Sequence, residues 1–404
     1  MTLFGIPGEF FIFALTLLGV AIFHHQALAV SVTGLVATVA FKLFLGGFSE
    51  GAGVAGLGAH FSHEWVLLAN LFLLLVGFAL MSAHFEHSGL PDRLPNWLPD
   101  NWTGGLVLLG IVFCLSAVLD NIAAAVIGGV VARHIYKGVV CVGFLAAIVA
   151  SANAGGAGSV IGDTTTTMMW IEGVSPLLLT KAWVAAVPAF LVFAIVAALQ
   201  QERFCSHVAP HAKDDVAIDW MRVGVVGVIL VTLVTANVTA NAFFPEAESI
   251  APVLGLALWA ALLVTALVRR PQWSAGSEAL RGATFLVCLV AAASLMPVED
   301  LPPASWQTAL GLGFLSSVFD NIPLTALALQ QGGYDWALLA YAVGFGGSMV
   351  WFGSSAGVAI TNLYPEARSV ARWLKEGWPI VVAYPVGFFL MLWLTGWNPT
   401  PVHP

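Results

Sequence analysis

The segment SAVLDNI at residues 116–122 recurs as SSVFDNI at residues 316–322. Each copy places an Asp-Asn pair inside an apolar stretch, which covers residues 103–135 in the first case and 304–330 in the second. Because such a polar pair interrupts the apolar pattern, we interpret each stretch as a helical hairpin with the pair at its tip. One ordinary helix with a polar spot is the alternative for each stretch.

The composition around these segments is that of a membrane protein. Of the 404 residues, 59% are hydrophobic and only 9% are charged, and the mean hydropathy is +0.91. Ordinary soluble domains have about 25% charged residues. The few basic residues exclude a nucleic-acid-binding protein, and the net charge of −8 excludes a polybasic peripheral protein. Four cysteines without paired spacing predict free thiols and no metal centre.

Apolar stretches long enough to cross about 30 Å of hydrocarbon recur along the whole chain. We expect ten crossings, at residues 9–23, 27–46, 64–82, 138–171, 179–200, 222–243, 251–268, 282–297, 334–362 and 378–396. Two of these stretches, 138–171 and 334–362, are too long for one straight helix and carry Gly, Ser and Thr clusters, so we expect helices broken at membrane depth. The two hairpins are then re-entrant, and the Gly-rich residues 47–63 form a surface loop or a short interfacial helix.

The distribution of basic residues orients the chain. When the loops are assigned to alternate faces, 12 of the 14 Lys and Arg residues fall on one face, and only Lys42 and Lys181 fall on the other. The positive-inside tendency makes the first face cytoplasmic. We therefore expect both termini outside, the first hairpin open to the cytoplasm and the second open to the outside.

A second repeated pattern accompanies the first. At an offset of 191, Gly155-Gly156 and Gly162-Asp163-Thr164 correspond to Gly346-Gly347 and Gly353-Ser354-Ser355. Each half then contains three helices, a hairpin, a broken helix and a closing helix. We expect an all-α polytopic protein with an inverted repeat of 5+5 transmembrane helices, divided into residues 1–200, a cytoplasmic linker 201–221 and residues 222–404. Inverted repeats with discontinuous helices are typical of secondary transporters.

Three aspartates at membrane depth need a physical reason. An ionised carboxylate near the bilayer centre costs roughly 2.5–3.5 kcal/mol. No Lys or Arg stands near Asp120, Asp163 or Asp320 in the predicted arrangement, so we expect a small cation or a proton as their partner. The alternative is that the carboxylates only cap the N-termini of half-helices.

Oxygen-bearing residues and glycines surround these aspartates, as a hard cation such as sodium requires. A carboxylate can bind a proton in place of the cation, and this competition couples the two fluxes. The hydroxyls of Thr166 and Thr167 equally fit bonds back to helix carbonyls. The candidate ion-binding residues are Asp120, Asn121, Gly156, Asp163, Thr164, Thr165, Asp320, Asn321, Gly353, Ser354 and Ser355, and the sodium candidates among them are Asp120, Asn121, Asp163, Asp320 and Asn321.

These motifs resemble those of a known family. The segments 119–122, 153–168, 319–325 and 353–358 are similar to the signatures of NhaD-type sodium/proton antiporters, within an ion transporter superfamily that includes arsenite, citrate and dicarboxylate carriers. The resemblance covers most of the chain. It implies a homodimer in the inner membrane of a bacterium, in which a transport part moves against a scaffold part by an elevator mechanism. The implied partners are sodium, protons and membrane lipids, with no nucleic acid and no enzymatic reaction.

Two classes of transport fit this pattern. The first exchanges sodium or lithium for protons at the aspartates, without a resident cofactor. The second is sodium- or proton-coupled transport of a small anion such as a carboxylate, bicarbonate or arsenite, held by hydroxyls and half-helix N-termini. Three acids without a basic side chain favour the first class. An intramembrane aspartyl protease would have no use for the Asp-Asn tips and Gly-rich breaks, and a passive channel would not need the inverted halves.

Overall fold

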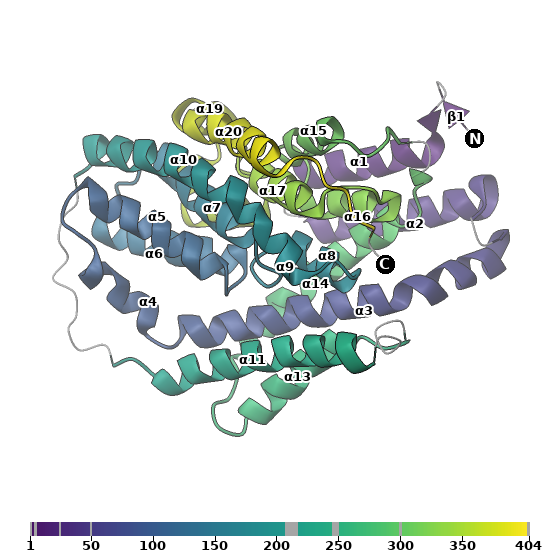
Figure 1. The fold of residues 1–404 in the computed structure, drawn as a ribbon, viewed down its shortest axis with the longest axis horizontal. Helices are drawn as coiled ribbons and strands as arrows, with labels where there is room; N and C mark the ends of the chain where they lie inside the picture. The colour runs from purple at the N-terminus through teal and green to yellow at the C-terminus, as the bar shows by residue number, and fades with distance from the viewer. Residues whose placement is uncertain are drawn as a thin grey trace. The chain divides into compact units, whose positions relative to one another are not determined.

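The structure is a computed structural model that describes residues 2–3, 6–23, 26–48, 51–206, 217–244, 250–298 and 301–401. Apart from two antiparallel strands of two residues each, β1 (Thr2–Leu3) and β2 (Ile6–Pro7), the elements in these residues are helical (Figure 1). Six helical stretches are long and apolar enough to cross a membrane: Ala27–Gly46, Gly53–Glu86, Pro176–Phe204, Trp220–Ala240, Trp273–Ala293 and Trp378–Thr395. The chain is therefore a multi-pass membrane protein.

The chain packs into two compact units, and each unit draws on both halves of the sequence. The first unit comprises residues 1–81, 224–303 and 322–332, and the second comprises 82–223, 304–321 and 333–404. This division follows spatial contacts, whereas the division expected from the repeat follows chain order. Residues 207–216, in the expected linker, lie outside the described residues.

The first unit is built from long apolar helices. They are α1 (Gly8–Ile22), α2 (Ala27–Phe41), α13 (Val253–Thr265), α14 (Trp273–Ala293), and most of α3 (Gly53–Glu86), α11 (Trp220–Phe243) and α16 (Asn321–Gln331). A π-helical turn, Lys42–Gly46, continues α2, which packs against α1 and α14. The Asn70 side-chain oxygen accepts a hydrogen bond from the Gly255 backbone N–H at 2.9 Å and so ties α13 to α3.

The second unit contains mostly shorter helices. They are α4 (Leu90–Arg93), α5 (Trp102–Ser116), α6 (Asn121–Ile135), α7 (Val142–Gly156), α8 (Thr164–Ile171), α9 (Pro176–Leu179), α10 (Trp183–Phe204), α15 (Trp306–Ser316), α17 (Trp336–Gly346), α18 (Ser355–Leu363), α19 (Val370–Glu376) and α20 (Trp378–Thr395). Short 3-10 turns at Leu94–Trp97, Thr180–Ala182 and Pro365–Ala367 connect some of them.

Helices α7 and α17 form the core of the second unit. Every residue of both helices is buried. A helix that is apolar on all sides belongs in an interior, and here α7 packs against α5, α6 and α10 while α17 packs against α15 and α20 (Figure 1). Because α7 ends at Gly156 and α17 ends at Gly346, the chain leaves both helices inside the unit.

The helices are interrupted where the sequence predicts it. Helix α5 ends at Ser116 and α6 begins at Asn121, and in the second half α15 ends at Ser316 and α16 begins at Asn321. The alternative of one continuous helix in each stretch is therefore wrong. The predicted breaks in 138–171 and 334–362 are also observed, because α8 begins only at Thr164 and α18 only at Ser355.

Two expectations about helix ends were wrong. Residues 53–63 were expected in a surface loop or a separate short helix, but they are the first three turns of α3. One glycine among them serves packing, because a Cβ atom on Gly56 would collide with the backbone carbonyl of Gly51. Helix α14 begins at Trp273 rather than near residue 282, since its polar first turns are tolerated on an amphipathic helix.

Candidate ion-binding site

Asp163 lies at the centre of the second unit, in the break between α7 and α8. It is the N-cap residue of α8, and its side chain is 1% exposed. The Thr165 hydroxyl donates to Oδ2 of Asp163 at 2.7 Å, and the Thr165 backbone N–H donates to Oδ1 at 3.4 Å. The cap explains why the helix begins here, because N-cap carboxylates satisfy amides that the first turn leaves unpaired.

Both Asp-Asn pairs deliver their asparagine to this carboxylate. The Nδ2 atoms of Asn121 and Asn321 each donate to Oδ1 of Asp163, both at 3.4 Å. Asn121 is the first residue of α6 and Asn321 is the first residue of α16, and both side chains are buried. Residues 200 positions apart thus meet at one oxygen atom.

Asn153 connects this carboxylate to the second break. It lies in α7 with 0% exposure, and its Oδ1 accepts from Asn121 Nδ2 at 3.2 Å. Its own Nδ2 donates to the Ser348 hydroxyl at 3.0 Å and to the Ser354 hydroxyl at 3.1 Å. The network therefore joins residues from both halves of the chain through side-chain amides.

Asp120 has a separate environment from Asp163. It caps the N-terminus of α6, where its Oδ1 accepts from the Ala123 backbone N–H at 2.9 Å. Its Oδ2 accepts from the Ser82 hydroxyl at 3.0 Å. Capping is thus a real role of Asp120 and of Asp163, but both carboxylates also accept side-chain hydrogen bonds that a cap does not need.

Asp320 and the start of α18 form the corresponding part of the second half. The Ser355 hydroxyl lies 3.5 Å from Oδ2 of Asp320. Ser354 is the N-cap of α18, and its hydroxyl accepts from the Gly357 backbone N–H at 3.3 Å. A hydroxyl therefore caps the half-helix that matches the one capped by Asp163.

Glycines bring backbone carbonyls close to the breaks. A Cβ atom on Gly156 would lie 2.5 Å from the Gly162 carbonyl oxygen and 3.2 Å from the Asp163 Cβ atom. A Cβ atom on Gly353 would lie 2.6 Å from the Ser317 carbonyl oxygen and 2.9 Å from that of Ser316. Only glycine allows this approach of one chain segment to another.

The run of threonines after Asp163 divides into different roles. The hydroxyls of Thr166 and Thr167 donate back to the Asp163 carbonyl at the helix start, at 2.8 and 3.0 Å, as the structural alternative predicts. They also donate to the Ser159 and Val160 carbonyls and so hold the break in shape. Thr164 is half-buried, and its hydroxyl makes no hydrogen bond within the described residues. Thr165 alone directs its hydroxyl at the carboxylate.

The site is electrostatically unbalanced. Ion pairs join Lys42 to Glu9, Arg222 to Asp219 and Arg372 to Glu376, but neither Asp120 nor Asp163 forms an ion pair with a described residue. The hydrogen-bond donors to Asp163 are neutral amides and a hydroxyl. The same residues hold no group of three or more His, Cys, Asp or Glu side chains arranged for a metal ion. One carboxylate among neutral hydrogen-bond donors, without a basic partner, suits a small monovalent cation or a proton.

The structure brings some of the predicted residues together in one hydrogen-bond network and leaves others outside it. Asn121, Asn321, Thr165 and Ser354 lie in one network with Asp163, whereas Asp120 and Asp320 contact other hydroxyls. The network also contains Asn153 and Ser348, and Asp120 has Ser82 as its partner; the candidate set did not include these three residues. For Asn153 and Ser82 the available signal was a polar residue in an otherwise apolar helix, and for Ser348 it was a polar residue directly after Gly346-Gly347.

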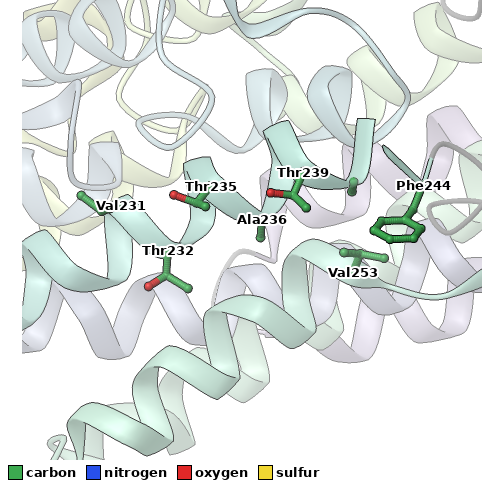
Figure 2. Close-up of a pocket in the computed structure, with 8 residues that line it drawn as sticks. Val231, Thr232, Thr235, Ala236, Thr239, Phe244 and Val253 are labelled. Atoms are coloured by element: carbon green, nitrogen blue, oxygen red, sulfur yellow. The ribbon is translucent and has the colours of Figure 1, made fainter. Parts of the chain in front are cut away.

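An open pocket lies elsewhere, in the first unit. Figure 2 shows its lining, which is made by α11 residues such as Thr232, Thr235 and Thr239 together with Phe244 and Val253. No lining side chain is ionisable, so this pocket offers no group that binds a proton or neutralises a cation.

The class of protein follows from these observations: a multi-pass helical membrane protein with discontinuous helices and a buried carboxylate at the point where they meet. No protein-family model matches the chain. Comparison with characterised proteins is more informative. The chain is 28% identical over 338 residues to "Sodium/proton antiporter 1" of Arabidopsis thaliana, covering 72% of this chain and 56% of that protein.

Bacterial proteins are similar over a larger share of their length. The chain is 27% identical over 394 residues to the "Na(+)/H(+) antiporter NhaD" of Vibrio cholerae, which covers 82% of this chain and 80% of that protein. It is 25% identical over 402 residues to the NhaD of Alkalimonas amylolytica, with 83% and 79% covered. The chain is thus a distant homologue of the NhaD Na+/H+ antiporters and of plant sodium/proton antiporters, as the motifs predicted. These relatives are named as transporters, not as enzymes.

Proposed function

We propose that the protein is a secondary active transporter that exchanges sodium or lithium ions for protons, with Asp163 as the group for which the two compete. The observation that carries this proposal is a buried carboxylate whose hydrogen-bond donors are all neutral. An ionised carboxylate in such a place costs several kcal/mol without a positive partner. A bound cation or a proton removes that cost.

The ligands for the cation come from the same network. Each asparagine amide that donates to Asp163 also carries an oxygen, and a half-turn of the amide group presents that oxygen instead of the nitrogen. With Asn121, Asn321 and the Thr165 hydroxyl, the carboxylate then has the oxygen-rich surroundings that a hard cation prefers. Asp120 and Asp320 add negative charge at the two hairpin tips and complete the proposed sodium ligands.

Exchange follows from competition for one carboxylate. When a proton occupies Asp163, the cation loses the charged ligand that Asn121, Asn321 and Thr165 surround. When the cation is bound, its charge opposes protonation. A site that carries one or the other, but not both, across the membrane couples the two fluxes in opposite directions.

The inverted repeat is part of the proposal. We infer 5+5 transmembrane helices in residues 1–200 and 222–404, with re-entrant hairpins and broken helices meeting at the site. Two features support this arrangement. An asparagine from each hairpin tip donates to Asp163. Glycines that correspond in the two halves also lie close to backbone carbonyls that correspond, as Gly353 lies close to the carbonyl of Ser316. The family resemblance adds a homodimer, an elevator movement and a bacterial inner membrane with both termini outside.

Transport of a small anion is less well supported. An anion carrier of this kind would use the N-termini of the half-helices to hold negative charge. Carboxylates already cap two of these termini, Asp120 on α6 and Asp163 on α8. An additional anion there would meet like charge.

Purified protein in proteoliposomes with a pH-sensitive dye inside tests the proposal. An inward sodium gradient should drive protons out of vesicles that contain the wild-type protein. In Asp163→Asn the loss of one charge near the cation costs roughly 4 kcal/mol at an effective dielectric of 20, or about a thousandfold in sodium affinity, so exchange should stop. Asparagine is as good an N-cap as aspartate, so the variant keeps its fold.

Asp92→Asn is the matched control, because Asp92 is an exposed carboxylate at the start of α4. It should exchange at the wild-type rate. Sodium-driven proton movement that persists in Asp163→Asn would refute the assigned role of Asp163. Proton movement driven by an anion gradient, without dependence on sodium, would favour the anion carrier.

A further inference from the structure

Gly344 occupies a position where the backbone does not call for glycine. It lies inside α17, among residues that are all buried, and it is not one of the glycines with positive φ. A glycine inside a helix is destabilising by roughly 0.5–1 kcal/mol relative to alanine. The absence of a side chain at this position must therefore serve a neighbour rather than the helix.

That neighbour is the carboxylate of Asp163. A Cβ atom on Gly344 would lie 2.8 Å from Oδ2 of Asp163, which is too close, whereas the Ala157 Cβ at 3.7 Å and the Thr165 Oγ1 at 3.9 Å are ordinary contacts. The Oδ2 atom is also held by the Thr165 hydroxyl at 2.7 Å. Oδ2 of Asp163 therefore lies in the space that a methyl group at position 344 would need.

The matching positions in the other half show the reverse arrangement. The offset of 191 that pairs Asp163 with Ser354 also pairs Asn153 with Gly344. Where the N-cap side chain is the short serine, the helix position beside it is asparagine, and the Asn153 amide reaches the Ser354 hydroxyl at 3.1 Å. Where the N-cap side chain is the longer aspartate, the helix position beside it is glycine. Each pair combines one larger and one smaller side chain.

We propose that Gly344 is a specificity-determining residue, which sets the room at the carboxylate and hence the size of the alkali cation that binds there. The inference rests on the proposed function, because it concerns selectivity at the same site. The two oxygens of Asp163 face opposite neighbours: Oδ2 faces Gly344, and Oδ1 faces the amides of Asn121 and Asn321. A methyl group at 344 pushes the carboxylate toward these amides and narrows the space between them. The narrowed site favours lithium over the larger sodium ion.

A thermal unfolding cycle tests the steric contact without any transport measurement. The proteins are wild type, Gly344→Ala, Asp163→Ser and the double variant, where serine keeps an N-cap and removes the crowded oxygen. Gly344→Ala should lower Tm in the wild-type background and leave it equal or higher in the Asp163→Ser background, because alanine is the better helix former once the clash is gone. The same fall in Tm in both backgrounds would overturn the contact.

Cation selectivity is read from the same purified proteins and from proteoliposomes. The ratio of half-maximal sodium to half-maximal lithium concentration should rise by about tenfold or more in Gly344→Ala, the low end of what one methyl group does in a close-fitting pocket. The control is Gly311→Ala, since Gly311 lies inside α15 and a Cβ atom added there would meet no atom within 4 Å. Its ratio should equal that of the wild type.

Each remaining outcome is decisive. An unchanged ratio in Gly344→Ala overturns the proposal. If transport by Gly344→Ala is too slow to measure, the rise in Tm that lithium chloride or sodium chloride produces is measured instead. A larger rise with lithium than with sodium supports the proposal, and no rise with either salt overturns it. If the wild-type protein responds to neither cation, the proposed function fails, while the unfolding cycle still reports on the contact.

Discussion

Asn153→Ala gives a prediction whose magnitude follows from individual hydrogen bonds. The variant loses the bonds to the hydroxyls of Ser348 and Ser354 and the bond accepted from Asn121, at 3.0, 3.1 and 3.2 Å. At about 1 kcal/mol for each net hydrogen bond, the loss is about 3 kcal/mol. The better helix propensity of alanine returns only about 0.6 kcal/mol. The penalty for leaving the buried Ser348 hydroxyl without this donor adds at least about 1 kcal/mol.

The expected net loss of stability is therefore about 3.4 kcal/mol or more, which corresponds to a fall in Tm of about 7 °C or more for a unit of this size. The assay is thermal unfolding of the purified protein in detergent. Ser151→Ala is the matched control, because Ser151 lies in the same helix with 0% exposure and its hydroxyl has no partner among the described residues. It should leave Tm unchanged or raise it. Equal Tm values for the two variants would refute the network as a source of stability.

Three further predictions concern exchange in proteoliposomes. Ser82→Ala removes a 3.0 Å hydrogen bond to Asp120. One charge-assisted hydrogen bond of about 1.4 kcal/mol corresponds to a change of about tenfold in the half-maximal sodium concentration. An unchanged half-maximal concentration would contradict a role of Asp120 beyond capping. Thr165→Val should slow exchange because Asp163 loses its closest hydrogen-bond donor, at 2.7 Å. The control Thr180→Val changes an exposed hydroxyl and should exchange at the wild-type rate. Equal exchange rates in the two variants would contradict the role of Thr165. For the wild type, competition predicts that the half-maximal sodium concentration rises as pH falls, by up to about tenfold for each pH unit, and a flat pH profile would exclude competition at one carboxylate.

The positions of the helix breaks were predictable because their cause is local. A charged residue cannot continue an apolar helix at low cost, and the side chains of Asp120 and Asp163 cap the helices that follow them. The start of α3 was not predictable in the same way. Its glycines at 53, 56 and 58 look like a loop, and of these three only Gly56 has a packing reason, which is its close approach to the Gly51 backbone.

The candidate site could likewise be predicted only in part from the sequence. The aspartates and hairpin asparagines stand out because polar side chains are rare in such stretches. The sequence does not show that Asn121 and Asn321 meet at one oxygen of Asp163, because that contact joins segments 200 residues apart. Asn153 and Gly344 were not among the candidates for a related reason: their importance lies in what touches them, which chain order does not reveal.

The most direct test of the central claim is a binding measurement without a membrane gradient. Radioactive sodium is titrated into the purified, weakly buffered protein while the released protons are counted. Competition at Asp163 predicts release of up to one proton for each sodium ion bound, with both signals lost in Asp163→Asn. Sodium binding that releases no protons at any pH, or that persists at wild-type affinity in Asp163→Asn, would contradict the account.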